Sequence, residues 1–216
     1  MTPNEMQRLV MTQSGILAPR MYEGVASALA DANTRTRGYK SEKYPHIRPM
    51  MARIAFREYL ESETLPAEWR LGGNPKLMGQ LYLTAPTLGL KLRFLKERRK
   101  TYPSGVPVAG KNRARREAWQ QGGLFPRPAV PVQQTQTMSE LLLLWDYAKK
   151  ESVAEGFTLR IVRPLAAGVY GQAVPYDLDI AVRPDGTIFT DMTFSGDSDD
   201  EDFFGEANID RAENEE

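Results

Sequence analysis

The 216-residue chain contains no cysteine and a single histidine, His46. The lack of cysteine excludes disulfides, thiol nucleophiles and cysteine-ligated zinc or iron–sulfur centres. Neither Gly-x-Ser-x-Gly nor His-Glu-x-x-His occurs, so two common hydrolase signatures are missing. No apolar run approaches the roughly 20 residues that span a bilayer, and the polar N-terminal segment 1–5 is unlike a signal peptide. We therefore expect a cytoplasmic protein with no membrane partner.

The first part of the chain has few negative charges and the second part has few positive ones. The formal net charge is +0, from 28 Lys+Arg and 28 Asp+Glu. Residues 1–127 contain 22 cations and 10 carboxylates, a net charge of +12, whereas residues 128–216 contain 6 and 18, a net charge of −12. Such asymmetry is typical of a protein that binds a polyanion, or of one whose acidic end screens its basic half.

The positive charge is concentrated in two segments. One segment has ten cations within 26 residues, opposed only by Glu97, and the other has five cations interleaved with Tyr39, Tyr44 and His46. Cations bind phosphates and aromatic rings stack on bases, so both segments are candidates for nucleic-acid binding. An acidic protein partner, the chain's own acidic end or a solvated surface would also explain them. The candidate residues are Lys91, Arg93, Lys96, Arg98, Arg99, Lys100, Lys111, Arg113, Arg115 and Arg116, with Arg35, Arg37, Lys40, Lys43 and Arg48.

The composition divides the chain into four regions. Residues 1–121 are a helical, basic N-terminal region with a small hairpin over 77–84 and 88–95. Residues 122–137 are a Pro/Gln-rich linker. Residues 138–195 are an antiparallel β-meander, and residues 196–216, with ten carboxylates and few apolar residues, are predicted to be a disordered acidic tail. The predicted fold class is therefore α+β, and the two ordered parts are expected to pack together because each has little core of its own.

Periodicity places the individual elements. Apolar spacing predicts helices from residue 3, from about 21 to 38 after a break at Ser14–Gly15, and through 51–59, with a short basic helix over 111–121. Alternation in 88–95 places Lys91 and Arg93 on a solvent-facing side of the hairpin. Further strands are predicted over 141–147, 157–162 and 177–183, and the Pro184–Gly186 segment predicts a hairpin loop.

Three carboxylates provide an enzymatic alternative. Asp177 and Asp179 share one face of a predicted strand, and the hairpin places Asp179 opposite Asp191. Opposed like charges destabilise a sheet, so a cation is expected beside them: an arginine such as Arg160 or Arg183, a lysine of the basic half, or a Mg²⁺ or Mn²⁺ ion. With a metal, the site would suit a nuclease or nucleotidyltransferase-like phosphoryl-transfer enzyme.

The Gly105–Lys111 segment matches the G-x4-G-K spacing of a phosphate-binding loop. Asn112 stands where the metal-binding Ser or Thr would follow, and no apolar strand directly precedes the segment. The spacing is therefore weak evidence for nucleotide hydrolysis.

The charge pattern favours a non-enzymatic binding or regulatory protein. Its basic surface would contact nucleic-acid phosphates, its acidic tail would tune affinity, and it would need no cofactor. The alternatives are a protein–protein adaptor of a host-defence or mobile-element system, and the metal-dependent enzyme with Mg²⁺ or Mn²⁺ at Asp177, Asp179 and Asp191.

Overall fold

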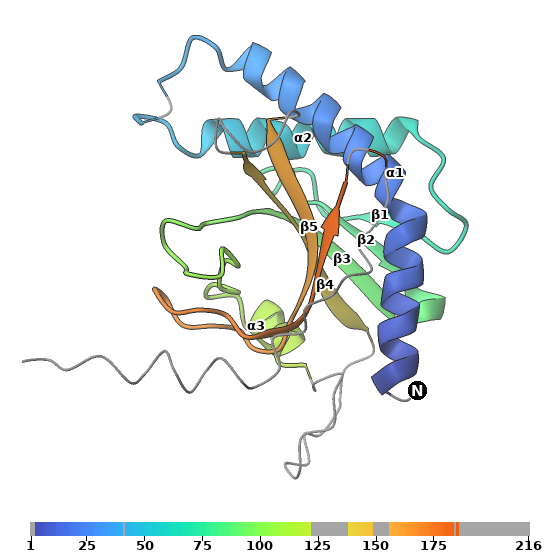
Figure 1. The fold of residues 1–216 in the computed structure, drawn as a ribbon. Coiled ribbons are helices and arrows are strands. Elements are labelled where there is room, and N and C mark those ends of the chain that lie inside the picture. Colours follow the sequence, from blue (N-terminus) through green and yellow to red (C-terminus); the bar gives the residue numbers. More distant parts are fainter. Residues whose placement is uncertain (1–2, 41, 122–137, 149–155, 184, 186–216) are drawn as a thin grey trace, which may run out of the picture.

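The structure is a computed structural model, and it describes residues 3–40, 42–121, 138–148, 156–183 and 185. It confirms the α+β class, with helices at the N-terminus followed by a mixed sheet (Figure 1). The elements are α1 (Pro3–Arg35), α2 (Ile47–Ser62), β1 (Arg70–Gly72), β2 (Tyr82–Ala85), the 3-10 turn η1 (Pro86–Leu88), β3 (Leu90–Lys96), α3 (Arg113–Trp119), β4 (Ser139–Tyr147), β5 (Phe157–Pro164) and β6 (Tyr176–Val182).

The six strands form one sheet in the order in which they occur along the chain. All neighbouring pairs are antiparallel except β3 and β4, which run parallel with Lys91 opposite Glu140 and Lys96 opposite Trp145. This parallel pair joins the hairpin to the later strands. The sequence predicted only antiparallel pairing, because a parallel pair depends on contacts that are distant along the chain.

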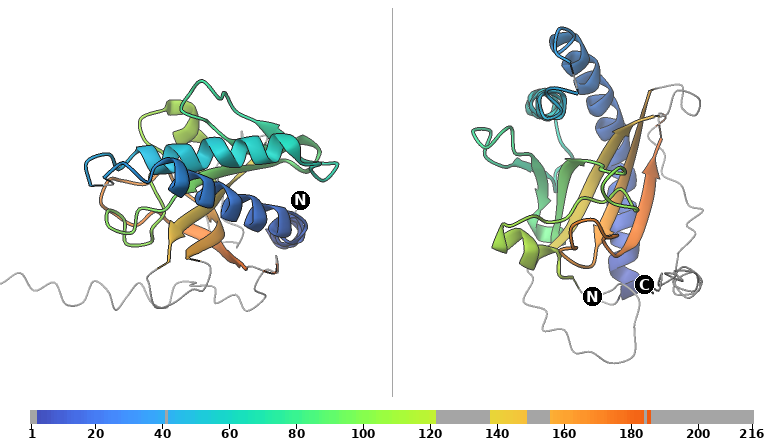
Figure 2. Two further views of the ribbon diagram at one scale, coloured as in Figure 1. Left: turned by 90° about the horizontal axis from the view of Figure 1, so that it is seen from above. Right: turned by 90° about the vertical axis from the view of Figure 1, so that its left-hand side faces the viewer.

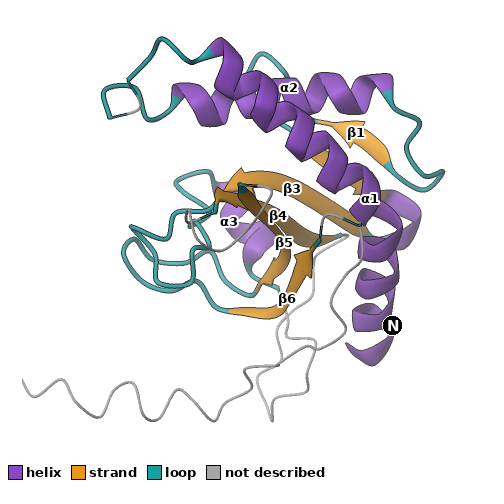
Figure 3. Ribbon diagram, turned by 45° about the horizontal axis from the view of Figure 1, so that its top comes forward, coloured by secondary structure: helices purple, strands orange, loops and turns teal. Residues whose placement is uncertain are grey.

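Helices α1 and α2 cover one face of the sheet (Figures 1 and 3). The predicted break at Ser14–Gly15 is wrong, because α1 runs without interruption through this point. Val10, Leu17, Ala18 and Met21, on both sides of the glycine, are at most 1% exposed. A glycine within a helix costs about 1 kcal/mol, whereas burying a single large apolar side chain contributes roughly 1.5–3 kcal/mol. Burial of this continuous face outweighs the local preference.

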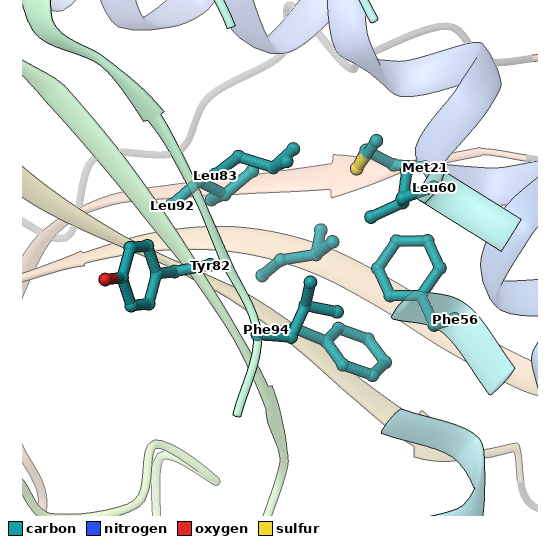
Figure 4. Close-up of a pocket in the computed structure, with 9 residues that line it drawn as sticks. Met21, Phe56, Leu60, Tyr82, Leu83, Leu92 and Phe94 are labelled. Carbon is teal, nitrogen blue, oxygen red and sulfur yellow. The ribbon is translucent and has the colours of Figure 1, made fainter. Parts of the chain in front are cut away.

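The main core lies between these helices and the sheet. Figure 4 shows Met21 of α1 and Phe56 and Leu60 of α2 near Leu83, Leu92 and Phe94 of β2 and β3. The rings of Phe56 and Phe94 lie 4.7 Å apart between centroids. The remaining gap of about 10 Å³ is near the lower limit for one water molecule. Its apolar lining makes it a packing gap rather than a ligand site.

The second face of the sheet has a smaller core. Trp119 of α3, with Val106 and Ala109, packs against Leu142 and Leu144 of β4. Helix α3 and the segment that contains Val106 and Ala109 therefore cover the face of the sheet on which Lys91 and Arg93 of β3 lie.

This covering corrects the expected position of the β3 cations. Arg93 is only 7% exposed and Lys91 is half-buried. The predicted alternation is right, but the face that it defines is not a solvent-facing one.

Several predictions concern residues outside the described part of the chain. These are the linker at 122–137, the hairpin loop around Pro184–Gly186 with Asp191 beyond it, and the acidic tail at 196–216. Among the helices that are described, none combines the length and the apolar character needed to cross a membrane, although α1 has 33 residues.

Candidate nucleic-acid interface

Three loops lie on the same side of the molecule (Figure 1; Figure 2, left panel). They are the α1–α2 turn (36–46), the segment from β3 to α3 (97–112) and the β5–β6 loop (165–175), and together we call them the loop surface. The loop surface contains seven Lys and Arg residues and two carboxylates, Glu42 and Glu97. Glu97 is 2% exposed, so the surface that faces solvent is strongly basic. Its cations are Arg37, Lys40, Lys43, Arg98, Arg99, Lys100 and Lys111.

The two basic segments of the sequence meet at Tyr147, the last residue of β4. Its hydroxyl donates a hydrogen bond to Asn33 Oδ1 at 3.1 Å, and it lies close enough to the Arg48 guanidinium for that charge to act on its pKa. Lys96 Nζ lies 5.8 Å from the centroid of the Tyr147 ring. Burial raises the pKa of Tyr147, and Arg48 acts against this rise. Arg48 belongs to the first basic segment and Lys96 to the second, so the fold brings together cations that are 48 positions apart.

The α1–α2 turn is fixed by Thr36, which is 3% exposed. Its hydroxyl donates to the carbonyl of Ala32 at 2.6 Å and accepts a hydrogen bond from Arg48 Nε at 3.3 Å. Beyond it, the rings of Tyr39 and Tyr44 meet edge to face with centroids 6.1 Å apart. Tyr39 is 54% exposed. The turn therefore presents an aromatic ring beside its cations.

The segment after β3 is anchored by an ionic network around Glu97. The buried carboxylate of Glu97 accepts hydrogen bonds from Arg99 and Arg160. Arg160 also pairs with Asp179 and donates to the carbonyl of Ser104 at 2.6 Å. Burial acts to lower the pKa of Arg160, but the charges of Asp179 and Glu97 raise it above its ordinary value. The network stabilises the turn that leaves Arg98 exposed.

An exposed aromatic ring also lies on the β5–β6 loop. Tyr170 is 78% exposed, and its ring centroid lies 6.0 Å from that of the buried Tyr102. Tyr102 belongs to the segment after β3, so this contact connects two of the three loops.

The predicted cations differ in whether a carboxylate already neutralises them. Ion pairs join Arg35 to Asp31, Lys91 and Arg93 to Glu140, Lys96 to Asp146, Arg99 to Glu97, and Arg113 to Glu117. With the residues that the structure describes, no ion pair is formed by Arg37, Lys40, Lys43, Arg48, Arg98, Lys100, Lys111, Arg115 or Arg116. Six of these nine are exposed and lie on the loop surface.

The carboxylates of the enzymatic alternative are paired with arginines. Asp179 contacts Arg160, and Asp177 lies 2.7 Å from Arg163 with both side chains 6% exposed. Burial raises the pKa of Asp179, although Arg160 opposes this. Asp191 lies outside the described residues. Within the described ranges, no group of three or more His, Cys, Asp or Glu side chains could hold a metal ion. Arginine therefore neutralises both described carboxylates, which is one of the alternatives expected from the sequence.

The Gly105–Lys111 segment does not follow a strand directly, because β3 ends at Lys96. The Asn112 side chain accepts a hydrogen bond from the Arg115 amide at 2.9 Å and so caps α3. This local geometry differs from that of a phosphate-binding loop between a strand and a helix.

Sequence reasoning missed Tyr147, Tyr170 and Arg53. Tyr147 lies in an apolar strand and Tyr170 in a Gly-rich loop, so their neighbours were not recognisable from local pattern. Arg53 lies within the helical stripe of α2, five positions beyond Arg48, the last cation of the first basic segment.

Comparison of the chain with protein-family models, with curated proteins and with solved structures found no match.

Proposed function

We propose that this protein is a non-enzymatic nucleic-acid-binding protein whose loop surface contacts backbone phosphates. The observation that carries the proposal is the meeting of the two basic segments at Tyr147. Exposed cations without ion pairs to described residues, such as Arg37, Lys40 and Lys100, lie on the loop surface. They can take up phosphates without first breaking an existing pair, and phosphate contacts supply most of non-specific nucleic-acid affinity.

The exposed rings of Tyr39 and Tyr170 support binding to single strands. Aromatic side chains beside a basic surface stack on unpaired bases with little dependence on sequence. Because loops rather than a projecting helix form this surface, we expect weak sequence specificity and a contact that is dominated by phosphates.

The acidic C-terminal segment would tune this affinity. Residues 197–216 contain ten carboxylates and one arginine, and so carry a formal charge of −9. A chain ending at Gly196 would have a net charge of +9, because the whole chain is neutral. Removing the segment should therefore strengthen binding, as it removes a competitor for the same cations.

The test is fluorescence anisotropy with labelled single- and double-stranded oligonucleotides at 50 and 200 mM salt. About six phosphate contacts predict a loss of roughly a thousandfold in affinity across this range. The triple variant Lys40→Gln/Arg98→Gln/Lys100→Gln should bind more weakly and lower the salt slope by about three. The matched control is Arg8→Gln/Arg70→Gln/Lys76→Gln, which removes three exposed cations elsewhere.

The proposal is wrong if neither the full chain nor the chain ending at Gly196 binds either oligonucleotide at 50 mM salt. Equal weakening by the two triple variants would also contradict it, since binding would then follow net charge rather than the loop surface. In either case, an acidic protein becomes the partner to test, as in the adaptor alternative.

A further inference from the structure

A second group of cations surrounds the Glu140 carboxylate of β4. Lys91 and Arg93 of β3 both contact Glu140 of β4, with Arg93 Nε 2.9 Å from Oε1 and Lys91 Nζ 3.2 Å from Oε2. Arg115 of α3 and Arg53 of α2 lie close enough to Arg93 for its charge to act on both, and we call these four cations with Glu140 the arginine cluster. Each oxygen of the Glu140 carboxylate, which is 3% exposed, thus already has one cationic partner.

Neutral groups hold these cations in place. The Tyr82 ring lies 4.8 Å from Lys91 Nζ and 5.5 Å from Arg93 Cζ. The chain around the cluster also supplies two carbonyls. Arg53 Nη1 donates to Met78 at 3.2 Å, and Arg115 Nη1 donates to Ala109 at 3.4 Å. The turn between β1 and β2, which contains Met78, packs against α2, because Arg57 Nη1 also donates to the Gln80 carbonyl at 3.1 Å.

The cluster has more positive charge than the described residues around it neutralise. It contains four cations and a single carboxylate, and neither Arg53 nor Arg115 has an ion pair with a described residue. Both arginines are half-buried, so each has lost part of its contact with water. Burial together with the neighbouring guanidinium groups lowers the pKa of Arg53 and of Arg115, while Glu140 raises that of Arg115.

The cluster also has unused hydrogen-bond donors. A guanidinium group has five N–H donors. Among the described residues, Arg53 and Arg115 each donate one side-chain hydrogen bond, and Arg93 donates through Nε alone. Several N–H donors of the described arginines, from α2, β3 and α3, are therefore not used by described residues. They suit a ligand that accepts hydrogen bonds through more than one oxygen.

We propose that the arginine cluster binds a phosphate monoester. The formal excess of three positive charges suits a group that carries about −1.5 to −2 at pH 7 better than a singly charged phosphodiester. Guanidinium groups match phosphate oxygens in a bidentate geometry that a lysine does not reproduce. The monoester is either the terminal phosphate of a nucleic-acid strand, which rests on the proposed function, or a small free phosphate compound.

The test uses three probes: inorganic phosphate, a 5′-phosphorylated oligonucleotide and the same oligonucleotide with a 5′-hydroxyl. Calorimetry measures phosphate binding to the full chain, and anisotropy compares the two oligonucleotides. The variants are Arg53→Gln and Arg115→Gln. A third variant, Arg115→Lys, separates the effect of positive charge from that of the bidentate guanidinium geometry. Arg8→Gln, which removes an exposed cation of α1, is the matched control, and circular dichroism verifies folding.

We expect Arg53→Gln and Arg115→Gln each to weaken phosphate binding by about tenfold or more, the worth of a charged hydrogen bond, and Arg8→Gln to leave it unchanged. Arg115→Lys should recover part of the loss. If the wild type also prefers the 5′-phosphorylated strand and the variants lose that preference, the ligand is a strand terminus. If both strands bind alike, the ligand is a small phosphate compound.

Two results would overturn the proposal. One is a wild-type chain that neither binds inorganic phosphate nor prefers the 5′-phosphorylated strand, and the other is cluster variants that bind as the wild type does. Failure of the loop surface would be seen separately, as weak binding of the 5′-hydroxyl strand.

Discussion

At the scale of single residues, Glu97 is the side chain on which the loop surface depends most. Its carboxylate is buried and contacts two arginines, Arg99 and Arg160. Arg99 is 55% exposed in its side chain, whereas that of Arg160 is 13% exposed. Removing one member of a buried ion pair leaves an uncompensated charge, and this costs far more than removing an exposed partner.

We therefore predict that Glu97→Gln lowers the free energy of unfolding by about 1.5–3 kcal/mol, the contribution of a hydrogen bond to a charged group, because Arg160 keeps Asp179 but loses its second carboxylate. The exposed control, Arg99→Gln, should cost about 1 kcal/mol or less. Urea unfolding followed by fluorescence measures both. Equal effects of the two substitutions would show that the network does not anchor the turn.

Residue pairing is also where sequence reasoning reached its limit. Alternation correctly placed Lys91 and Arg93 on one face of β3. It could not show that Glu140, 47 positions beyond Arg93, would pair with them, because local pattern has no information about which distant strand lies alongside. The same limit concealed Arg53, whose neighbours in space lie on β3 and α3.

At the scale of elements, Gly24 determines how closely α1 and α2 pack. A Cβ atom at this position would lie 2.5 Å from the Tyr59 ring and 2.8 Å from the Phe56 ring. Phe56 is 1% exposed and contacts Phe94 of β3, so it has little room to move. Overpacking of this kind costs roughly 1–3 kcal/mol, which exceeds the gain of about 1 kcal/mol from replacing a helical glycine by alanine.

Gly24→Ala should therefore destabilise the protein by up to about 2 kcal/mol, the difference between these opposing effects. At Gly38, where a Cβ would have no neighbour within 4 Å, the same substitution should cost less than about 0.5 kcal/mol. Thermal unfolding of both variants makes the comparison. Stabilisation by Gly24→Ala would mean that the two helices can separate without loss.

Elements with a clear period were predicted well, and those fixed by distant contacts were not. The spacing from Met51 to Tyr59 lies within α2, and the alternation from 157 to 162 lies within β5. Strand β1 has only three residues and depends on pairing with β2, so its own sequence gave no signal. The break expected at Ser14–Gly15 failed because local preference is weaker than burial of the helix face.

At the scale of the whole molecule, the core is shared between the two parts that the sequence separated. Leu92 and Phe94 of β3 lie in the same core cluster as Leu143 and Trp145 of β4. The adjacent β3 and β4 strands pair over seven residues, from Leu90 opposite Ser139 to Lys96 opposite Trp145. Residues 1–121 without β4 would expose one edge of β3 and the apolar side chains that β4 and β5 cover, so this part should not keep its fold when separated.

We predict that the fragments 1–121 and 138–216 each lack native near-ultraviolet circular dichroism, and that mixing them restores it. The intact chain should unfold in one transition, because the two parts share one core. Tryptophan fluorescence can follow this transition in both parts of the sheet, since Trp69, Trp119 and Trp145 are all at most 4% exposed. Coincident fluorescence and circular dichroism curves in urea would verify this. A fragment 1–121 that unfolds cooperatively at the urea midpoint of the full chain would contradict it. The basic loops 36–46 and 97–112 would then belong to an independent unit, and their meeting with β4 at Tyr147 would not be needed to present the basic surface.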